Sequence, residues 1–186
     1  MPARTRRSAL GLLPGLALAA LAAPAAALAG PQPDGEIGIG QALPDARLRG
    51  LNGPSRMLAD YLGQALVINV WASWCGPCRQ EMASLERLAW REQVPPLRII
   101  GISTDDDPRQ ALALLARTNA TISHFIDEQL LWEHLLGAST LPLTVLVDAQ
   151  GRVRDKVHGA QEWDGPQALA RIARALGQPG ARSPAA

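Results

Sequence analysis

The chain has 186 residues, and its 18 Lys and Arg nearly balance its 17 Asp and Glu, which gives a formal net charge of +1. Beyond the first 29 residues no basic cluster stands out, which argues against nucleic-acid binding. The two cysteines would need further ligands for a structural zinc site, and His124, His134 and His158 form no short ligand pair near them. The composition therefore fits a globular domain whose chemistry lies in its cysteines.

The first 29 residues have the pattern of a secretory signal. Arg4, Arg6 and Arg7 precede an apolar stretch at 9–28, which ends in small residues up to Ala29. Cleavage there would leave 157 residues, with 15 basic and 17 acidic side chains, enough for one domain with a core. We therefore expect a periplasmic or otherwise extracytoplasmic protein. An uncleaved anchor in the inner membrane is the alternative, because about 20 apolar residues span a bilayer.

The remaining chain reads as one domain of alternating strands and helices. Strands and helices followed by a hairpin and a helix predict an α/β fold, a mixed sheet with helices on both faces. The sequence divides into a linker at 30–40, a domain at 41–177 and a flexible tail at 178–186. The first half of the domain is predicted to contain a hairpin at 46–49 and 56–58, a buried strand at 66–71, a helix from Cys78 that Pro95 stops, and a strand at 97–102. The second half is predicted to contain a helix at 108–118, a helical insertion at 126–136, a hairpin at 143–147 and 153–158, and a helix at 165–176.

Cys75 and Cys78, the only cysteines, lie between a predicted strand and a predicted helix, in the sequence Cys-Gly-Pro-Cys. The first thiol would lie at a helix N-terminus, where backbone N–H groups and the helix dipole stabilise a thiolate. A purely structural bridge across so short a loop would add little stability. We therefore predict thiol-disulfide exchange, in which Cys75 attacks and Cys78 resolves the mixed disulfide. Gly76 and Pro77 shape the turn between them, and proline suits the first turn of a helix.

Residues 71–79, Trp-Ala-Ser-Trp-Cys-Gly-Pro-Cys-Arg, closely resemble the active site of thioredoxin-fold proteins. Asn69 lies where thioredoxin has a buried acid. Glu81 follows the second cysteine by three residues, as in the exported TlpA/ResA-like and CcmG/DsbE-like reductases. Residues 140–144 resemble the cis-proline loop of that family. The resemblance covers about residues 41–176 and implies a thioredoxin-like fold: a central mixed β-sheet flanked by helices, with an N-terminal hairpin and a helical insertion before the cis-proline loop.

The resemblance also implies roles for several side chains. Pro142 would be cis, which would leave the Leu141 backbone free to pair with a substrate segment beside Cys75. Trp74 would form an apolar rim around the reacting sulfurs and serve in docking. Glu81 could exchange protons with the resolving thiol, although a solvated helix carboxylate is the alternative reading of that position.

The family implies an exported reductase of protein disulfides that uses the Cys75–Cys78 dithiol and no other cofactor. Its partners would be a disulfide-containing client and a membrane thiol-disulfide electron donor, with apocytochrome c during haem attachment as a candidate client. We expect a monomer. Two alternatives stay open. One is a thiol peroxidase of the peroxiredoxin type, although Ala72 and Ser73 do not reproduce a Thr-x-x-Cys loop. The other is a copper-binding thioredoxin-like chaperone, although those proteins space their cysteines by three residues.

The other aromatic and acidic residues read as structural. Trp90, Trp132 and Trp163 are expected in the core or at partly buried positions. The acidic triplet 105–107 is expected to cap the helix that begins at Pro108 rather than to bind a metal. The histidines are expected to be structural or solvated.

Overall fold

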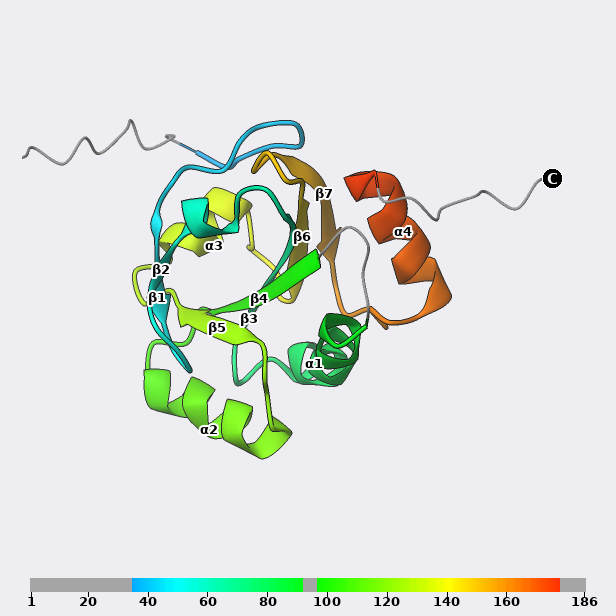
Figure 1. The fold of residues 1–186 in the computed structure, drawn as a ribbon. Coiled ribbons are helices and arrows are strands. Elements are labelled where there is room, and N and C mark those ends of the chain that lie inside the picture. Colours follow the sequence, from blue (N-terminus) through cyan, green and yellow to red (C-terminus); the bar gives the residue numbers. More distant parts are fainter. Residues whose placement is uncertain (1–34, 92–96, 178–186) are drawn as a thin grey trace, which may run out of the picture.

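Strands and helices alternate along residues 35–91 and 97–177, which are the residues that the computed structural model describes (Figure 1). The predicted signal at 1–29 and the predicted tail at 178–186 lie outside them. Within the described ranges, no helix is long and apolar enough to cross a membrane. The elements are β1 Arg47–Gly50, β2 Arg56–Met57, the 3-10 helix η1 Leu58–Tyr61, β3 Ala65–Trp71, α1 Gly76–Ala89, β4 Leu97–Ser103, α2 Pro108–Thr118, β5 Ser123–Ile126, α3 Leu131–Leu136, β6 Leu143–Val147, β7 Val153–His158 and α4 Pro166–Leu176.

The strands form one seven-stranded mixed sheet in the order β2-β1-β5-β4-β3-β6-β7. β3, β4 and β5 run parallel, while β6 pairs antiparallel with β3 and β1 pairs antiparallel with β5. All seven residues of β3 are buried, and they alternate between the two faces of the sheet. Leu66 faces one core layer and Val67 faces the other. By the same alternation, Asn69 lies on the face that α1 covers.

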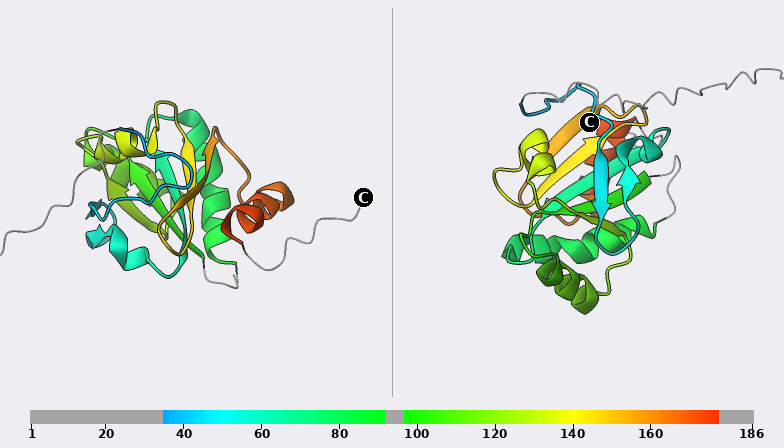
Figure 2. Two further views of the ribbon diagram at one scale, coloured as in Figure 1. Left: turned by 90° about the horizontal axis from the view of Figure 1, so that it is seen from above. Right: turned by 90° about the vertical axis from the view of Figure 1, so that its left-hand side faces the viewer.

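Helices cover both faces of the sheet, as the sequence predicted (Figures 1 and 2). On one face α1 and α4 share a core with β3, β6 and β7, and α1 shares a second core with α2. On the other face η1 and α3 pack over β3, β4 and β6, together with Ile37 and Leu43 from the N-terminal segment. The helix that follows the cysteines is therefore held between the sheet and two further helices.

The region between α2 and β6 differs from the prediction. The predicted helical insertion at 126–136 is wrong in its first part, because Ile126 is the last residue of β5 and α3 begins at Leu131. β5 has only four residues, too short for periodicity to separate a strand from a helix. It forms because it pairs with β4 on one side and β1 on the other, a tertiary effect that local sequence does not contain.

The part of the predicted linker that the structure describes packs against the domain. Ile37 is 2% exposed and donates its N–H to the carbonyl oxygen of Leu135 at 2.8 Å. The Gly40 N–H is bonded to the carbonyl oxygen of Val153 at 2.7 Å. Residues 35–40 therefore cover one edge of the core, although their Gly-rich sequence has no strand or helix periodicity.

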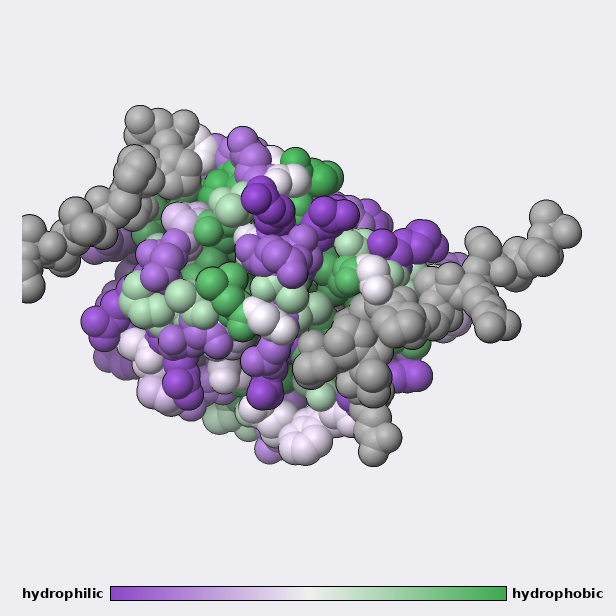
Figure 3. Space-filling view, turned by 45° about the horizontal axis from the view of Figure 1, so that its top comes forward, coloured by the Kyte–Doolittle hydropathy of each residue, from purple (hydrophilic) through white to green (hydrophobic). Residues whose placement is uncertain are grey.

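On the face shown in Figure 3, hydrophobic residues lie in small groups between hydrophilic ones. Among the described residues, the large apolar side chains that are more than half exposed lie far apart in the sequence, in turns outside the helices and strands: Ile39, Leu62, Trp74 and Trp90. Trp90 is 75% exposed, which corrects the expectation of a core or partly buried position. It directly follows α1, and its indole N–H is bonded to Thr121 Oγ1 at 3.0 Å.

Candidate active site

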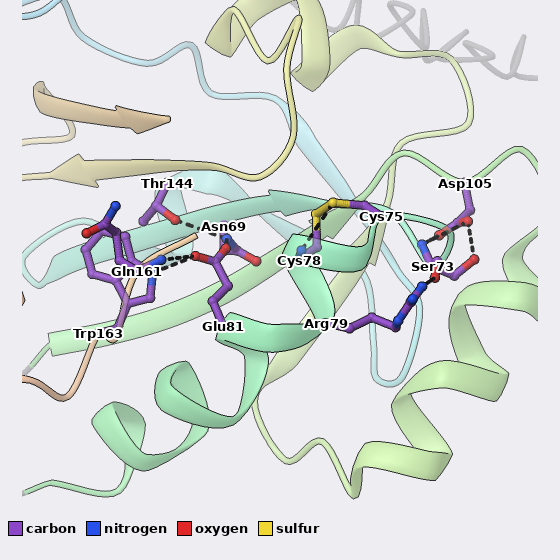
Figure 4. Close-up of a disulfide and its surroundings, with 10 residues drawn as sticks. All are labelled: Asn69, Ser73, Cys75, Cys78, Arg79, Glu81, Asp105, Thr144, Gln161 and Trp163. Carbon is purple, nitrogen blue, oxygen red and sulfur yellow. Dashed lines mark hydrogen bonds between the residues drawn. A yellow bond between two sulfur atoms is a disulfide. The ribbon is translucent and has the colours of Figure 1, made fainter. Parts of the chain in front are cut away.

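The two cysteines lie at the N-terminus of α1, joined by a disulfide (Figure 4). Cys75 is the N-cap residue, and its Sγ accepts a hydrogen bond from the Cys78 backbone N–H at 3.2 Å. Pro77 occupies the first turn, where its missing N–H costs the helix no bond. Cys75 is 5% exposed and Cys78 is 0% exposed. Solvent and a client therefore reach Cys75 first, in the place where a thiolate is best stabilised.

Asp105 fixes the loop that leads to Cys75. Its carboxylate accepts the Ser73 backbone N–H at 2.9 and 3.1 Å and the Ser73 hydroxyl at 2.6 Å. The Ser103 hydroxyl donates to the same carboxylate at 2.7 Å. On the other side of the loop, Arg79 Nη1 donates to the Ser73 carbonyl oxygen at 2.9 Å. Ser73 is thus held from the end of β4 and from α1 at once, two residues before the nucleophile.

This contact separates the acidic triplet into two roles. Asp107 is the N-cap of α2 and accepts the Arg109 N–H at 3.0 Å, which confirms the predicted cap. Asp105 is 2% exposed and belongs to the active-site loop instead. The only sequence signal for this role was the position of Asp105 just after a buried strand. β3 and β4 are parallel, so the loops that follow them lie at the same edge of the sheet.

The two tryptophans beside the dithiol have opposite environments. Trp74 is 68% exposed next to Cys75, which suits the predicted apolar rim. Trp71 is 0% exposed and donates its indole N–H to His124 Nδ1 at 3.1 Å. The two rings meet edge to face, with centroids 5.3 Å apart. His124 lies over Gly101 of β4, where a Cβ would come within 2.1 Å of Nδ1, so the glycine makes room for the imidazole.

The peptide bond between Leu141 and Pro142 is cis, as the resemblance implied. Leu141 is partly buried and packs against the cluster of buried residues that contains both cysteines. The Pro142 carbonyl oxygen accepts the Gly159 N–H at 2.9 Å, which ties the loop to the end of β7. The predicted substrate-binding loop and the dithiol therefore lie side by side.

Glu81 is 1% exposed, which overturns the reading of a solvated helix carboxylate. Its Oε1 accepts a hydrogen bond from Asn69 Nδ2 at 2.6 Å. Its Oε2 accepts the Gln161 backbone N–H at 3.1 Å and the Trp163 indole N–H at 3.0 Å (Figure 4). Spacing of three residues places Glu81 on the same face of α1 as Cys78, and both side chains are buried there.

Burial raises the pKa of Glu81, because desolvation penalises the carboxylate more than its hydrogen bonds stabilise it. The bonds from Trp163, Gln161 and Asn69 act in the opposite direction. A buried carboxylate with a raised pKa takes up a proton more readily than an exposed one, which suits it to proton exchange. The geometry thus supports a proton-exchanging group beside the resolving thiol.

Sequence reasoning missed the residues that hold Glu81. Trp163, expected to be a packing residue, is 0% exposed, but it also donates to the carboxylate. The Ser84 hydroxyl, one turn after Glu81 on α1, accepts the Trp163 backbone N–H at 3.0 Å. Contacts between residues about 80 positions apart leave no local pattern. Asn69 was noted only because of the resemblance.

Among residues 35–91 and 97–177, no group of three or more His, Cys, Asp or Glu side chains lies close enough together to hold a metal ion. The two cysteine sulfurs are bonded to each other in the Cys75–Cys78 disulfide.

Comparisons with known proteins agree with this site. The sequence profile of the AhpC/TSA family matches residues 39–156. The thiol:disulfide interchange protein DsbE of Allochromatium vinosum is 37% identical over 130 residues, 64% of this chain and 68% of that protein. The thiol-disulfide oxidoreductase ResA of Geobacillus thermodenitrificans is 28% identical over 123 residues, 66% of this chain and 71% of that protein. A crystal structure of a Chlorobium tepidum protein named as a DsbE-type thiol:disulfide interchange protein matches with a TM-score of 0.69 and 26% identity, over 76% of this chain and 99% of the other. The predicted thioredoxin-like fold is thereby confirmed.

Proposed function

Since the chain belongs to the AhpC/TSA family and is a thiol-disulfide oxidoreductase of the ResA and DsbE type, we propose that it reduces protein disulfides outside the cytoplasm. The observation that carries the exchange mechanism is the buried Glu81 carboxylate on the same helix face as the buried Cys78. Reduction of a client requires Cys78 to lose a proton, and Glu81 is the acid-base group placed to accept it.

The proposed reaction uses both thiols of the reduced protein. The Cys75 thiolate attacks one sulfur of the client disulfide; the client S–S bond breaks, and the first client sulfur leaves as a thiolate that takes a proton. Cys78 then passes its proton to Glu81, and its thiolate attacks Cys75 Sγ. The mixed disulfide breaks, the second client thiolate departs, and the Cys75–Cys78 disulfide forms. Two electrons have moved from the protein to the client.

The surroundings of Cys75 suit a polypeptide client. Trp74 offers an exposed apolar face directly before the nucleophile, and Leu141 packs beside the dithiol at the cis-proline. We propose that an extended client segment pairs with the Leu141 backbone while an apolar client side chain contacts Trp74. Pro142 has no backbone N–H, so it cannot donate a hydrogen bond to the Leu141 segment in place of the client.

The electrons that regenerate the dithiol must come from another thiol carrier, and we propose a membrane thiol-disulfide donor. The predicted signal at 1–29 supports an extracytoplasmic location, either free or tethered to the inner membrane. Apocytochrome c before haem attachment is the proposed client, because its haem-binding Cys-x-x-Cys pair would form a disulfide of the kind that this site can open. We propose that the protein acts as a monomer.

The reduction potential of the Cys75–Cys78 pair tests the direction. The purified chain would be equilibrated with glutathione, and Trp fluorescence would report the dithiol, because Trp74 adjoins Cys75. A value near that of thioredoxin, about −270 mV, would support a reductase; a value near that of DsbA, about −120 mV, would make the protein a disulfide donor. Cys78→Ser is the matched control, because it keeps the nucleophile but cannot close the ring.

The same preparation separates the alternatives. Fast consumption of hydrogen peroxide without exchange with glutathione would favour a thiol peroxidase. A copper complex that survives a competing chelator would favour the copper-binding chaperone. For the client, the reduced protein should open an oxidised Cys-x-x-Cys-His peptide faster than an unrelated protein disulfide; equal rates would remove the support for apocytochrome c.

A further inference from the structure

Each hydrogen-bond partner of the Glu81 carboxylate in the described part of the chain is a donor. The Gln161 backbone N–H and the Trp163 indole N–H share Oε2, and Asn69 Nδ2 donates to Oε1. A backbone N–H and an indole N–H can only donate. This set of partners satisfies an ionised carboxylate but offers nothing to accept the O–H of a protonated one. If Glu81 takes a proton during turnover, a partner must change its role.

Asn69 is the partner that can change. A side-chain amide carries a donor NH2 and an acceptor oxygen of almost the same shape, so a half-turn about its last torsion exchanges them. In Figure 4 the Asn69 oxygen points away from Glu81 and from Thr144. After the half-turn that oxygen would occupy the present place of Nδ2, 2.6 Å from Glu81 Oε1, and could accept its O–H.

Thr144 is compatible with both orientations. Its Oγ1 now accepts a second hydrogen bond from Asn69 Nδ2 at 3.0 Å. A hydroxyl can donate as well as accept, so Thr144 could donate to the Asn69 oxygen after the half-turn. Both states of the three residues Asn69, Glu81 and Thr144 would then be fully hydrogen-bonded, which matters because an unpaired buried polar group is costly.

We propose that the Asn69 amide is a proton-coupled switch that turns its NH2 toward Glu81 when the carboxylate is ionised and its oxygen toward Glu81 when the carboxylic acid forms. The inference rests on the proposed function, in which Glu81 receives the Cys78 proton. Asn69 is a positioning residue here, since it acts on Glu81 and does not contact the reacting sulfurs. An aspartate at this position would place a second carboxylate beside the first and could not donate when ionised.

The space around Asn69 and the charges around Glu81 fit the switch. Asn69 lines a cavity of about 200 Å³ beneath α1, so the end of the amide that turns away from Glu81 can be hydrated in either orientation. The hydrogen-bond partners of Glu81 from β3 and the segment before α4 are neutral, as is Thr144 on β6. The titratable group on its own helix face is Cys78. None of these hydrogen-bond partners is an ion that would hold Glu81 in the charged state, and burial raises its pKa.

In the reaction, the switch would turn once in each direction. Cys78 S–H gives its proton to Glu81, Asn69 turns to accept the new O–H, and the Cys78 thiolate closes the disulfide with Cys75 while the client sulfur leaves. Glu81 later loses the proton to water or to the departing thiolate, and the amide turns back. The client disulfide is the oxidant and the dithiol is the reductant, so no further reactant is needed.

The test is an NMR titration of the intact oxidised protein, compared with its Glu81→Gln variant. The Glu81 side-chain carboxyl ¹³C signal and the Asn69 side-chain NH2 signals should shift with one common midpoint. Glu81→Gln mimics the protonated acid, so its Asn69 NH2 signals should stay at the low-pH position of the wild type at every pH. Asn69 signals that ignore the Glu81 titration, or that keep the high-pH position in Glu81→Gln, would overturn the switch.

Two threonine variants add a matched pair, because only one keeps the hydroxyl. Thr144→Ser should preserve the common midpoint and the rate at which Cys78 resolves a mixed disulfide. Thr144→Val removes the Thr144 hydrogen bond from both orientations of the amide, so it should leave the balance between them unchanged and keep one common midpoint for the Asn69 and Glu81 signals. Separate midpoints for the Asn69 and Glu81 signals in either variant would count against the switch.

The rate of resolution also separates this inference from the proposed function. If Glu81→Gln resolves the mixed disulfide as fast as the wild type, the proton-accepting role of Glu81 fails and the switch fails with it. If Glu81→Gln is slow while the Asn69 signals do not follow Glu81, the role of Glu81 stands and only the switch is refuted.

Discussion

Lowering the pH from 7 to 4 should destabilise the protein through His124. The imidazole is 3% exposed, its Nδ1 accepts the Trp71 indole N–H at 3.1 Å, and its ring lies over Gly101. Its Nε2 is a buried side-chain atom for which the described residues provide no hydrogen-bond partner. Protonation would place an N–H against the Trp71 N–H and a charge in an apolar core. Burial accordingly lowers the pKa of His124 from 6.5 to about 4.

The sign and size of the effect follow from that shift. The unfolded chain binds a proton at His124 below about pH 6.5, whereas the folded protein does not until about pH 4. Stability from this residue is therefore fully present above pH 6.5 and is lost as the pH falls toward 4. Lowering the pKa of His124 from 6.5 to about 4 corresponds to about 3 kcal/mol of unfolding free energy.

Urea denaturation at pH 7.5 and pH 4 measures this loss. His124→Gln keeps an acceptor for Trp71 but cannot titrate, so its stability should fall by about 3 kcal/mol less than that of the wild type over the same interval. His158→Gln is the matched control, because His158 is exposed on β7; it should show the full loss. Equal losses for the wild type and His124→Gln, or a pKa near 6.5 for His124 by NMR, would refute the reasoning.

Three further substitutions test contacts at the site. Asp105→Ala removes the acceptor of the Ser73 N–H and hydroxyl and should cost about 2 to 4 kcal/mol in urea denaturation, with partial recovery in Asp105→Asn; no loss would mean that water replaces the carboxylate. Trp163→Phe keeps most of the packing but removes a donor to Glu81, so it should raise the pKa of Glu81 further; an unchanged ¹³C titration would contradict this. Leu85→Ala should cost about 2 to 5 kcal/mol, because Leu85 of α1 is 1% exposed in the core between that helix and the sheet; a loss well below this range would show that the core collapses into the space.

The elements with strong periodicity were predictable from sequence. α2 at Pro108–Thr118 and the hairpin strands Leu143–Val147 and Val153–His158 have the predicted bounds, because helical spacing and turn residues define them locally. β5 was not predictable, since four residues form a strand only by pairing with two distant neighbours. The same limit applies to residues 35–40, whose contacts lie about a hundred residues further along the chain.

At the site, the dithiol could be predicted from sequence because its chemistry lies in four consecutive residues. The cis bond at Pro142 came from the resemblance alone, because about 95% of bonds before proline are trans. Burial of Glu81 could not be derived from the helix pattern, since a glutamate is ordinarily exposed. Its environment is built by Asn69 and Trp163, which only the folded chain brings together.

The hydrogen bond from Trp163 to Glu81 affects the order in which the site can form during folding. The chain is synthesised from its N-terminus, and 82 residues separate the two side chains. A nascent chain therefore exposes both thiols well before the segment that encloses the carboxylate has been made. Until that segment packs against α1, Glu81 is exposed to solvent. During that time the cysteines can react without the buried proton acceptor of the folded protein. The active site is therefore complete only when the last quarter of the sequence has folded onto it.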